Sequence, residues 1–149
     1  MLPQQRVSLR GFSMDVRLAV LADYANISRE GKLNIMGVFG EINPPVLPFQ
    51  LPTMYLVASF QASPAEVGQQ KDVRVALVSE EGKEILALEQ SMVVPPPKRA
   101  GSWTDLVAIF CLNGISFRDP GSYAFHFLVG GETKTTVPLR VNEAPSGET

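Results

Sequence analysis

The sequence predicts a single all-β domain, an antiparallel sandwich of about eight strands. Short runs in which apolar and polar residues alternate recur from residue 15 to residue 141, and Gly, Pro and Asn bound them. The 149 residues include 12 Pro and 12 Gly, which implies frequent turns. Signals for helix are almost absent, since only residues 64–70 favour a single helical turn. A chain of this length can bury a core without disulfides or metals.

The first two runs, residues 16–24 and 32–39, are joined by a turn containing Glu30 and Gly31. In the first run, alternation predicts that Leu21 lies on the outer face, opposite the even-numbered residues of the core face. Those residues are Val16, Leu18, Val20 and Ala22. The second run is apolar on both faces, which predicts a strand that is covered on both sides.

Residues 43–52 contain four prolines, so we expect an extended connection between the two sheets and no sheet pairing. A strand over residues 53–62 follows. Residues 72–79 and 83–94 are predicted to form a hairpin, because they flank a second Glu-Gly turn.

Residues 103–112 are apolar on both sides, which predicts a central strand. Its expected partners are residues 121–129 and 133–141, joined by a hairpin turn at Gly130 and Gly131. Pro138 predicts that the last strand lies at an edge or carries a bulge. We expect residues 14–142 to form the domain, with residues 1–13 as a flexible leader and residues 143–149 as a flexible tail.

A motif in the first hairpin carries a family resemblance: Asp-Tyr-Ala-Asn at residues 23–26, followed by Gly-Lys-Leu-Asn-Ile-Met-Gly-Val-Phe at residues 31–39. With these residues the sequence resembles a bacterial family of small proteins known as a domain of unknown function. The likeness continues at residues 51–58, 112–117, 120–123 and 137–141. The resemblance implies an immunoglobulin-like β-sandwich, and it implies no activity, cofactor or residue role.

Composition argues against several classes of protein. The net charge is −2 and no run of Lys or Arg could follow a phosphate backbone, so we expect no nucleic-acid partner. No apolar stretch approaches the roughly 18 residues of a membrane span, so we expect no membrane partner. Cys111 is the only cysteine, which leaves no disulfide or thiolate zinc site and favours a cytoplasmic location. We expect no cofactor.

No residues form a recognisable catalytic or metal site. His126 is the only histidine and has no second His or Cys at metal spacing, so we interpret it as a solvated or capped strand residue. Cys111 is expected to act as a small hydrophobe. Asp23 and Asn26 are expected to cap the first turn, since with Glu30 they supply too few carboxylates for calcium. The chain is therefore predicted not to be an enzyme, unless a partner chain supplies catalytic groups.

The loop that follows Pro95-Pro96-Pro97 is a candidate recognition loop. Lys98, Arg99 and the only tryptophan, Trp103, follow this stiff segment, and Trp and Arg are enriched in binding hot spots. The alternative is a plain connection in which Trp103 is buried at the start of a core strand.

A surplus of apolar residues on the predicted outer faces is the most informative functional signal. Outer faces of a sandwich are usually polar, so this surplus predicts that another element or another subunit covers one sheet. We therefore expect a non-enzymatic protein-association module that binds a protein partner or itself, forming a homo-oligomer. The candidate interface residues are Met36, Val38, Tyr55, Val57, Val107 and Ile109, with Leu21 and Leu128 as further outer apolar residues.

The alternative is a domain that binds a small ligand or a carbohydrate. In that case Tyr55, Trp103 or Tyr123 would supply a stacking platform, and Asn34 or Asn113 would supply polar contacts. This alternative predicts exposed aromatic rings at one end of the sandwich.

Overall fold

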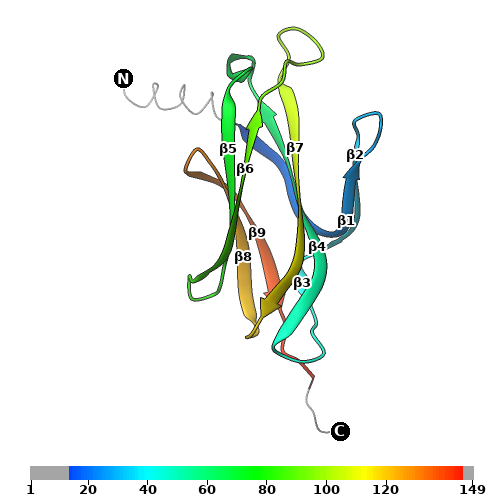
Figure 1. Ribbon diagram of the computed structural model, residues 1–149, viewed down its shortest axis with the longest axis vertical. Helices are drawn as coiled ribbons and strands as arrows, with labels where there is room; N and C mark the ends of the chain where they lie inside the picture. Colours follow the sequence, from blue (N-terminus) through cyan, green and yellow to red (C-terminus); the bar gives the residue numbers. More distant parts are fainter. Residues whose placement is uncertain (1–13, 146–149) are drawn as a thin grey trace.

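The computed structural model describes residues 14–145, which form two β-sheets packed face to face (Figure 1). The predicted leader, residues 1–13, and the last four residues of the predicted tail lie outside this range. A single 3-10 turn, η1 (Pro64–Glu66), interrupts the strands. The strands are β1 (Asp15–Ile27), β2 (Leu33–Phe39), β3 (Glu41–Ile42), β4 (Phe49–Ala62), β5 (Gln70–Val78), β6 (Glu84–Val93), β7 (Thr104–Phe117), β8 (Gly121–Val129) and β9 (Glu132–Val141).

One sheet has four strands in the order β2-β1-β4-β7, and the other has five in the order β3-β9-β8-β5-β6. All strand pairs are antiparallel except the short pair of β3 with β9. This confirms the predicted all-β sandwich. The structure has nine strands, and the one that was not among the eight predicted runs is β3, which is only two residues long.

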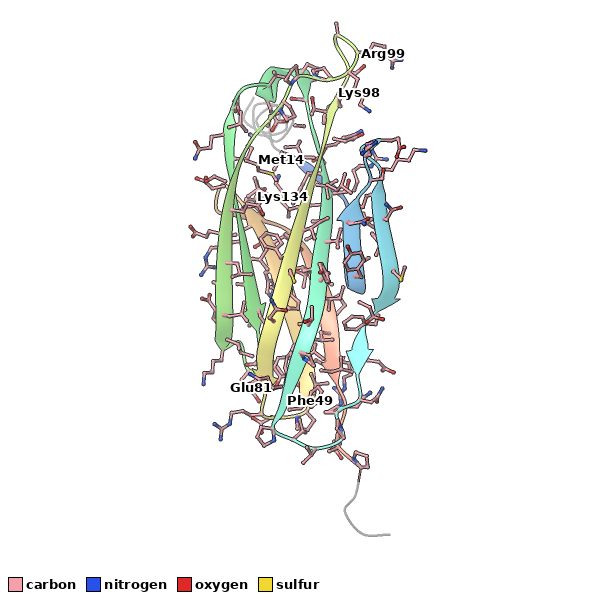
Figure 2. The ribbon with its side chains drawn as sticks, turned by 45° about the vertical axis from the view of Figure 1, so that its right-hand side comes forward. Met14, Phe49, Glu81, Lys98, Arg99 and Lys134 are labelled. Atoms are coloured by element: carbon pink, nitrogen blue, oxygen red, sulfur yellow. The ribbon has the colours of Figure 1, made fainter. Side chains whose placement is uncertain are left out.

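The core lies between the two sheets and is built from alternate residues of each strand. In β8, for example, Tyr123, Phe125, Phe127 and Val129 are all buried. The ring centroid of Phe127 lies 6.2 Å from that of Phe60 and 6.3 Å from that of Phe110, so aromatic rings link the sheets. Met14, labelled in Figure 2, is also fully buried, so the packed domain includes this residue.

The prediction that residues 103–112 form a central strand is wrong, because β7 lies at the edge of the four-stranded sheet and pairs only with β4. The predicted partners, β8 and β9, belong to the other sheet. The apolar residues on the second side of β7 do not indicate cover on that side, since Val107 and Ile109 are half-buried and Cys111 is exposed. Cys111 is therefore not the small buried hydrophobe that we predicted.

The predicted faces of β1 are also wrong. Leu21 is fully buried in the core, whereas Leu18 is exposed on the outer face. The pairing of β1 with β4 is irregular between Val16 and Leu18, so that Val16 still packs against the core while the alternation that follows is reversed. A one-residue shift of this kind exchanges the two faces of a strand.

The second run, β2, is an edge strand and is not covered on both sides. Met36 and Val38 are 68% and 61% exposed. Gly37, between them, has φ +73°, and a β-carbon at this position would overlap the side chain of Asp23. Glycine is therefore favoured where β2 faces Asp23 on β1.

Residues 43–48 cross from the five-stranded to the four-stranded sheet, as predicted, but the expectation that residues 43–52 stay outside both sheets is wrong. β4 begins at Phe49 and includes Pro52. Pro52 is tolerated because the paired stretch of β1 begins opposite Tyr55, so β4 has only β7 beside it at the proline.

The three predicted hairpins are confirmed. The first two turns share one chemistry: the Ser28 hydroxyl accepts a hydrogen bond from the Lys32 N–H at 3.0 Å, and the Ser79 hydroxyl accepts one from the Lys83 N–H at 3.1 Å. Ser28, and not Asp23 or Asn26 as predicted, therefore caps the first turn. In β9, the predicted edge position of Pro138 is confirmed, since β3 pairs only with the last two residues of that strand.

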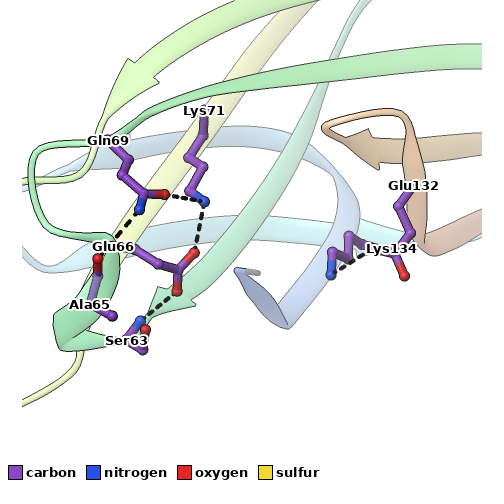
Figure 3. Close-up of polar contacts among 7 residues, drawn as sticks. All are labelled: Ser63, Ala65, Glu66, Gln69, Lys71, Glu132 and Lys134. Atoms are coloured by element: carbon purple, nitrogen blue, oxygen red, sulfur yellow. Dashed lines mark hydrogen bonds and ion pairs between the residues drawn. The ribbon is translucent and has the colours of Figure 1, made fainter. Parts of the chain in front are cut away.

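A buried carboxylate closes one end of the sandwich (Figure 3). Glu66 is fully buried; its Oε2 accepts a hydrogen bond from the Ser63 N–H at 2.7 Å, and its Oε1 lies 2.9 Å from the Nζ of Lys71. Gln69 accepts a hydrogen bond from the same lysine at 3.0 Å. Because both oxygens of Glu66 have partners, this charge belongs to the stability of the fold.

We expect Phe127→Ala to lower the free energy of unfolding by about 3–5 kcal/mol, because it removes a fully buried ring from the contact between the sheets. Val46→Ala, at a side chain that is 60% exposed, should change it by no more than about 0.5 kcal/mol. Urea denaturation of both variants measures the difference. Equal stability of the two variants would contradict the assigned core.

We expect Lys71→Met to lower the free energy of unfolding by about 3–5 kcal/mol, because it leaves Glu66 buried without its counter-charge. The double variant Lys71→Met/Glu66→Gln should recover most of this loss. Lys134→Met is the matched control, since Lys134 pairs with a half-exposed Glu132 and its loss should cost no more than about 1 kcal/mol. If Lys71→Met behaves like this control, the ion pair is not a stabilising contact.

Candidate functional site

The outer side of the four-stranded sheet carries a continuous apolar surface. Residues directly opposite in a strand pair share a face, so the strand registers define its rows. Val20 lies opposite Val57, which lies opposite Ile109. In the next row, Val38, Ala22, Tyr55 and Cys111 lie side by side across all four strands.

We call this surface the apolar face. Its four most exposed members lie on β1 and β2: Met36 at 68%, Val38 at 61%, Tyr24 at 46% and Leu18 at 38%. No member carries a charged side chain. The apolar face consists of Leu18, Val20, Ala22, Tyr24, Met36, Val38, Tyr55, Val57, Val107 and Ile109.

All six residues of the predicted interface lie on the apolar face, although the strands that carry them are far apart in the sequence. Met36 and Val38 are exposed, and Tyr55, Val107 and Ile109 are half-buried. Val57, at the centre, is fully buried and can only support its neighbours. Leu128 lies on the other sheet, away from this group.

Four further residues complete the apolar face, and the sequence pattern assigned none of them to it: Leu18, Val20, Ala22 and Tyr24. Leu18, Val20 and Ala22 were predicted for the core face because the irregularity in β1 cannot be read from alternation. Tyr24 packs edge-on against Tyr55, with ring centroids 5.2 Å apart and an interplanar angle of 71°. Two aromatic rings therefore adjoin the exposed side chains of β2.

Polar groups lie beside these rings, and they add no charge to the apolar face. Contact with the Cys111 side chain, followed by partial burial, raises the pKa of the Tyr55 hydroxyl above its ordinary value. Tyr55 is thus neutral at physiological pH. The Asn113 Oδ1 accepts a hydrogen bond from the Thr53 hydroxyl at 2.9 Å, at the margin of the face.

The candidate recognition loop lies at one end of the sandwich, where Lys98 and Arg99 project (Figure 2). The Nε of Arg99 donates a hydrogen bond to the Ser102 hydroxyl at 3.2 Å. Trp103 is 42% exposed, so it is not buried at the start of a core strand. The loop and Gly31, in the first hairpin turn, line an open hollow of about 480 Å³.

The structure does not bring the three predicted stacking residues together. Tyr55 lies on the apolar face, and Trp103 lies in the end loop. Tyr123 is buried in the core, where its hydroxyl donates a hydrogen bond to the Asp119 carbonyl at 2.6 Å. Asn34 already has a polar partner, because its side-chain amide donates a hydrogen bond to the Asn26 Oδ1 at 3.0 Å. Of the three alternative stacking residues, Trp103 is the one exposed at an end of the sandwich, and Tyr123 is excluded by its burial.

A second hollow, of about 270 Å³, lies between the β5–β6 turn and the β7–β8 connection. Its lining includes Glu80 and Glu81 of the second Glu-Gly turn, together with Arg118 and Asp119. The Oε1 of Glu80 accepts a hydrogen bond from the Ser122 N–H at 2.9 Å. This carboxylate therefore ties the two connections together.

His126 lies on the five-stranded sheet, where its Nδ1 is 3.3 Å from the hydroxyl oxygen of Thr136. Among residues 14–145, no three His, Cys, Asp or Glu side chains lie close enough together to hold a metal ion. The same part of the chain contains no helix with the length and hydropathy needed to cross a membrane.

A solved structure has a similar fold. It is the alkylpurine DNA glycosylase AlkC of Pseudomonas fluorescens bound to DNA that contains an abasic site analogue, with a TM-score of 0.51 and 15% sequence identity. The match covers 91% of this chain and 32% of the glycosylase chain, so the likeness concerns about a third of that protein and shows the fold alone.

No curated protein matches the sequence. A family model does match, and it covers residues 17–142, which include every described strand residue except Asp15 and Val16. This match confirms the resemblance carried by the first hairpin. The chain belongs to a family of unknown function, DUF6941.

Proposed function

We propose that this protein is a non-enzymatic, self-associating module and that the apolar face of its four-stranded sheet is the contact between copies. One observation supports this proposal most strongly: four large apolar side chains are 38–68% exposed on one continuous face. Contiguous apolar surface on a folded protein is typical of an interaction site.

The absence of charge on the apolar face favours a second copy as the partner. In a twofold-symmetric contact the same surface meets itself, so any charged side chain near the axis approaches its own copy. None of the ten side chains is charged, and the face therefore carries no like-charge repulsion against itself. Aromatic residues and methionine, represented by Tyr24, Tyr55 and Met36, are enriched in such contacts.

The glycosylase match does not favour DNA as a partner. A fold shared at 15% identity says nothing about ligands. The chain also has 15 acidic and 13 basic residues, a poor balance for binding a phosphate backbone.

A small ligand or carbohydrate remains the second candidate, because Trp103 is exposed beside Arg99 over the end hollow. Trp103 is the only tryptophan, so its fluorescence reports directly on this loop. We expect no saturable change in emission when mono- and oligosaccharides are titrated. A saturable shift that Trp103→Ala abolishes would favour the ligand-binding alternative.

We expect Val38→Lys to reduce the assembled mass of the protein, measured by sedimentation velocity, because it places a charge on the apolar face against a second copy. Val93→Lys is the matched control: Val93 is also a strand valine, is 60% exposed against 61% for Val38, and lies on the other sheet. The two lysines are therefore introduced at equally exposed strand positions, and Val93→Lys should assemble like the wild type.

Two results would overturn this proposal. In one, Val38→Lys and Val93→Lys both keep the wild-type mass. In the other, the wild-type protein is monomeric at every concentration tested.

A further inference from the structure

The four edge strands of the sandwich differ in how well they are protected against pairing with another chain. Proteins usually block an exposed edge with a short strand, charges, proline or a bulge. β3 has only two residues, β6 carries Glu84 and Glu89, and β2 is interrupted by Gly37 with φ +73°. In β7, the eight residues 106–113 contain no charge, proline or glycine.

The far side of β7 is free within the described chain. Its ladder with β4 runs from Phe117 opposite Phe49 to Thr104 opposite Ala62, without a shift of register. Among residues 14–145, no other strand pairs with β7. Every second residue of an edge strand directs its N–H and C=O groups away from its neighbour, so β7 presents a long row of unpaired groups.

We propose that β7 of one copy pairs antiparallel with β7 of a second copy, about a twofold axis that passes through Ile109. This inference rests on the proposed self-association and adds a second contact to it. The two four-stranded sheets then become one continuous sheet of eight strands.

The polar residues of β7 select this register. Asp105 and Asn113 lie four residues on either side of Ile109, on the same outer side of the strand. An antiparallel pair centred on Ile109 therefore places Asp105 opposite Asn113 of the second copy. A shift of the axis toward the start of β7 by one or two residues places Asp105 opposite Cys111 or Ile109, and the carboxylate loses its amide partner. A shift toward the end of the strand by one or two residues places it opposite Ile115 or Phe117, whose side chains are buried in the core.

Both members of this polar pair are available. No ion pair or hydrogen bond engages the exposed Asp105 side chain within residues 14–145. Asn113 uses its Oδ1 to accept from Thr53, so its amide N–H groups can donate to a carboxylate. At the same register, Val107 faces Cys111 of the second copy, and Ala108 faces Phe110, so small side chains meet large ones.

Edge pairing also widens the apolar face. Joining two sheets along β7 places two apolar faces on the same side of the eight-stranded sheet. Two such sheets can then stack through these faces, which gives a tetramer with three twofold axes, a common symmetry for soluble proteins. The wild type should therefore have a mass of four times 16.2 kDa.

A cysteine cross-link tests the register. Cys111 is the only cysteine, so Ile109→Cys/Cys111→Ser carries a single thiol on the proposed axis. Directly opposite residues in a strand pair have β-carbons about 4.5–5.5 Å apart, within reach of a short bismaleimide. We expect most of this variant to run as a covalent dimer after treatment. Thr133→Cys/Cys111→Ser, with its thiol exposed on β9 of the other sheet, should remain uncross-linked.

The mass of Val38→Lys separates the two contacts. If β7 strands pair, Val38→Lys loses only the contact between stacked apolar faces and remains a dimer joined through β7. If β7 strands do not pair, Val38→Lys is a monomer. Hydrogen exchange on the wild type gives an independent check, because the amides of residues 106–113 that point away from β4 should become more protected as assembly proceeds. A wild type that assembles, a monomeric Val38→Lys and no cross-linking of Ile109→Cys/Cys111→Ser would overturn edge pairing and leave the proposed function intact. A wild type that is monomeric overturns both.

Discussion

The ladder between β4 and β7 is the constraint on which the rest of the structure depends. It pairs two strands of 14 residues, and alternate residues of each must project to opposite faces. One side delivers Leu56, Phe60 and Phe110 to the core. The other side carries Tyr55, Val57 and Ile109, so the strands that build half of the core also build the apolar face. This sheet therefore has two apolar sides, of which the second sheet covers one.

Much of the fold could be predicted from the sequence. Alternation located eight of the nine strands, and the Glu-Gly and Gly-Gly turns located the hairpins, because both signals act over a few residues. Order within the sheets was harder to predict. Apolar residues on both sides of β7 suggested a central strand, but the same pattern occurs at an edge whose outer side is not covered. Long-range pairing of β4 with β7 leaves no local signal.

The candidate site, like the fold, could be predicted from the sequence only in part. The surplus of apolar residues identified six members of the apolar face, because alternation places residues correctly in β2, β4 and β7. It failed in β1, where the irregularity between Val16 and Leu18 exchanges the faces and returns Leu21 to the core. The three alternative stacking residues show the same limit of sequence patterns: Tyr55, Trp103 and Tyr123 lie on an outer face, in an end loop and in the core. Their separation follows from topology, which spacing in the sequence does not report.

The mass of the wild-type protein in solution tests the central claim most directly. Light scattering across a wide range of concentration distinguishes a chain of 16.2 kDa from its multiples. If copies cover one another's apolar faces, the mass reaches a plateau at a defined multiple, with no open-ended growth. A mass of 16.2 kDa at every concentration would show that this face is not a contact between copies.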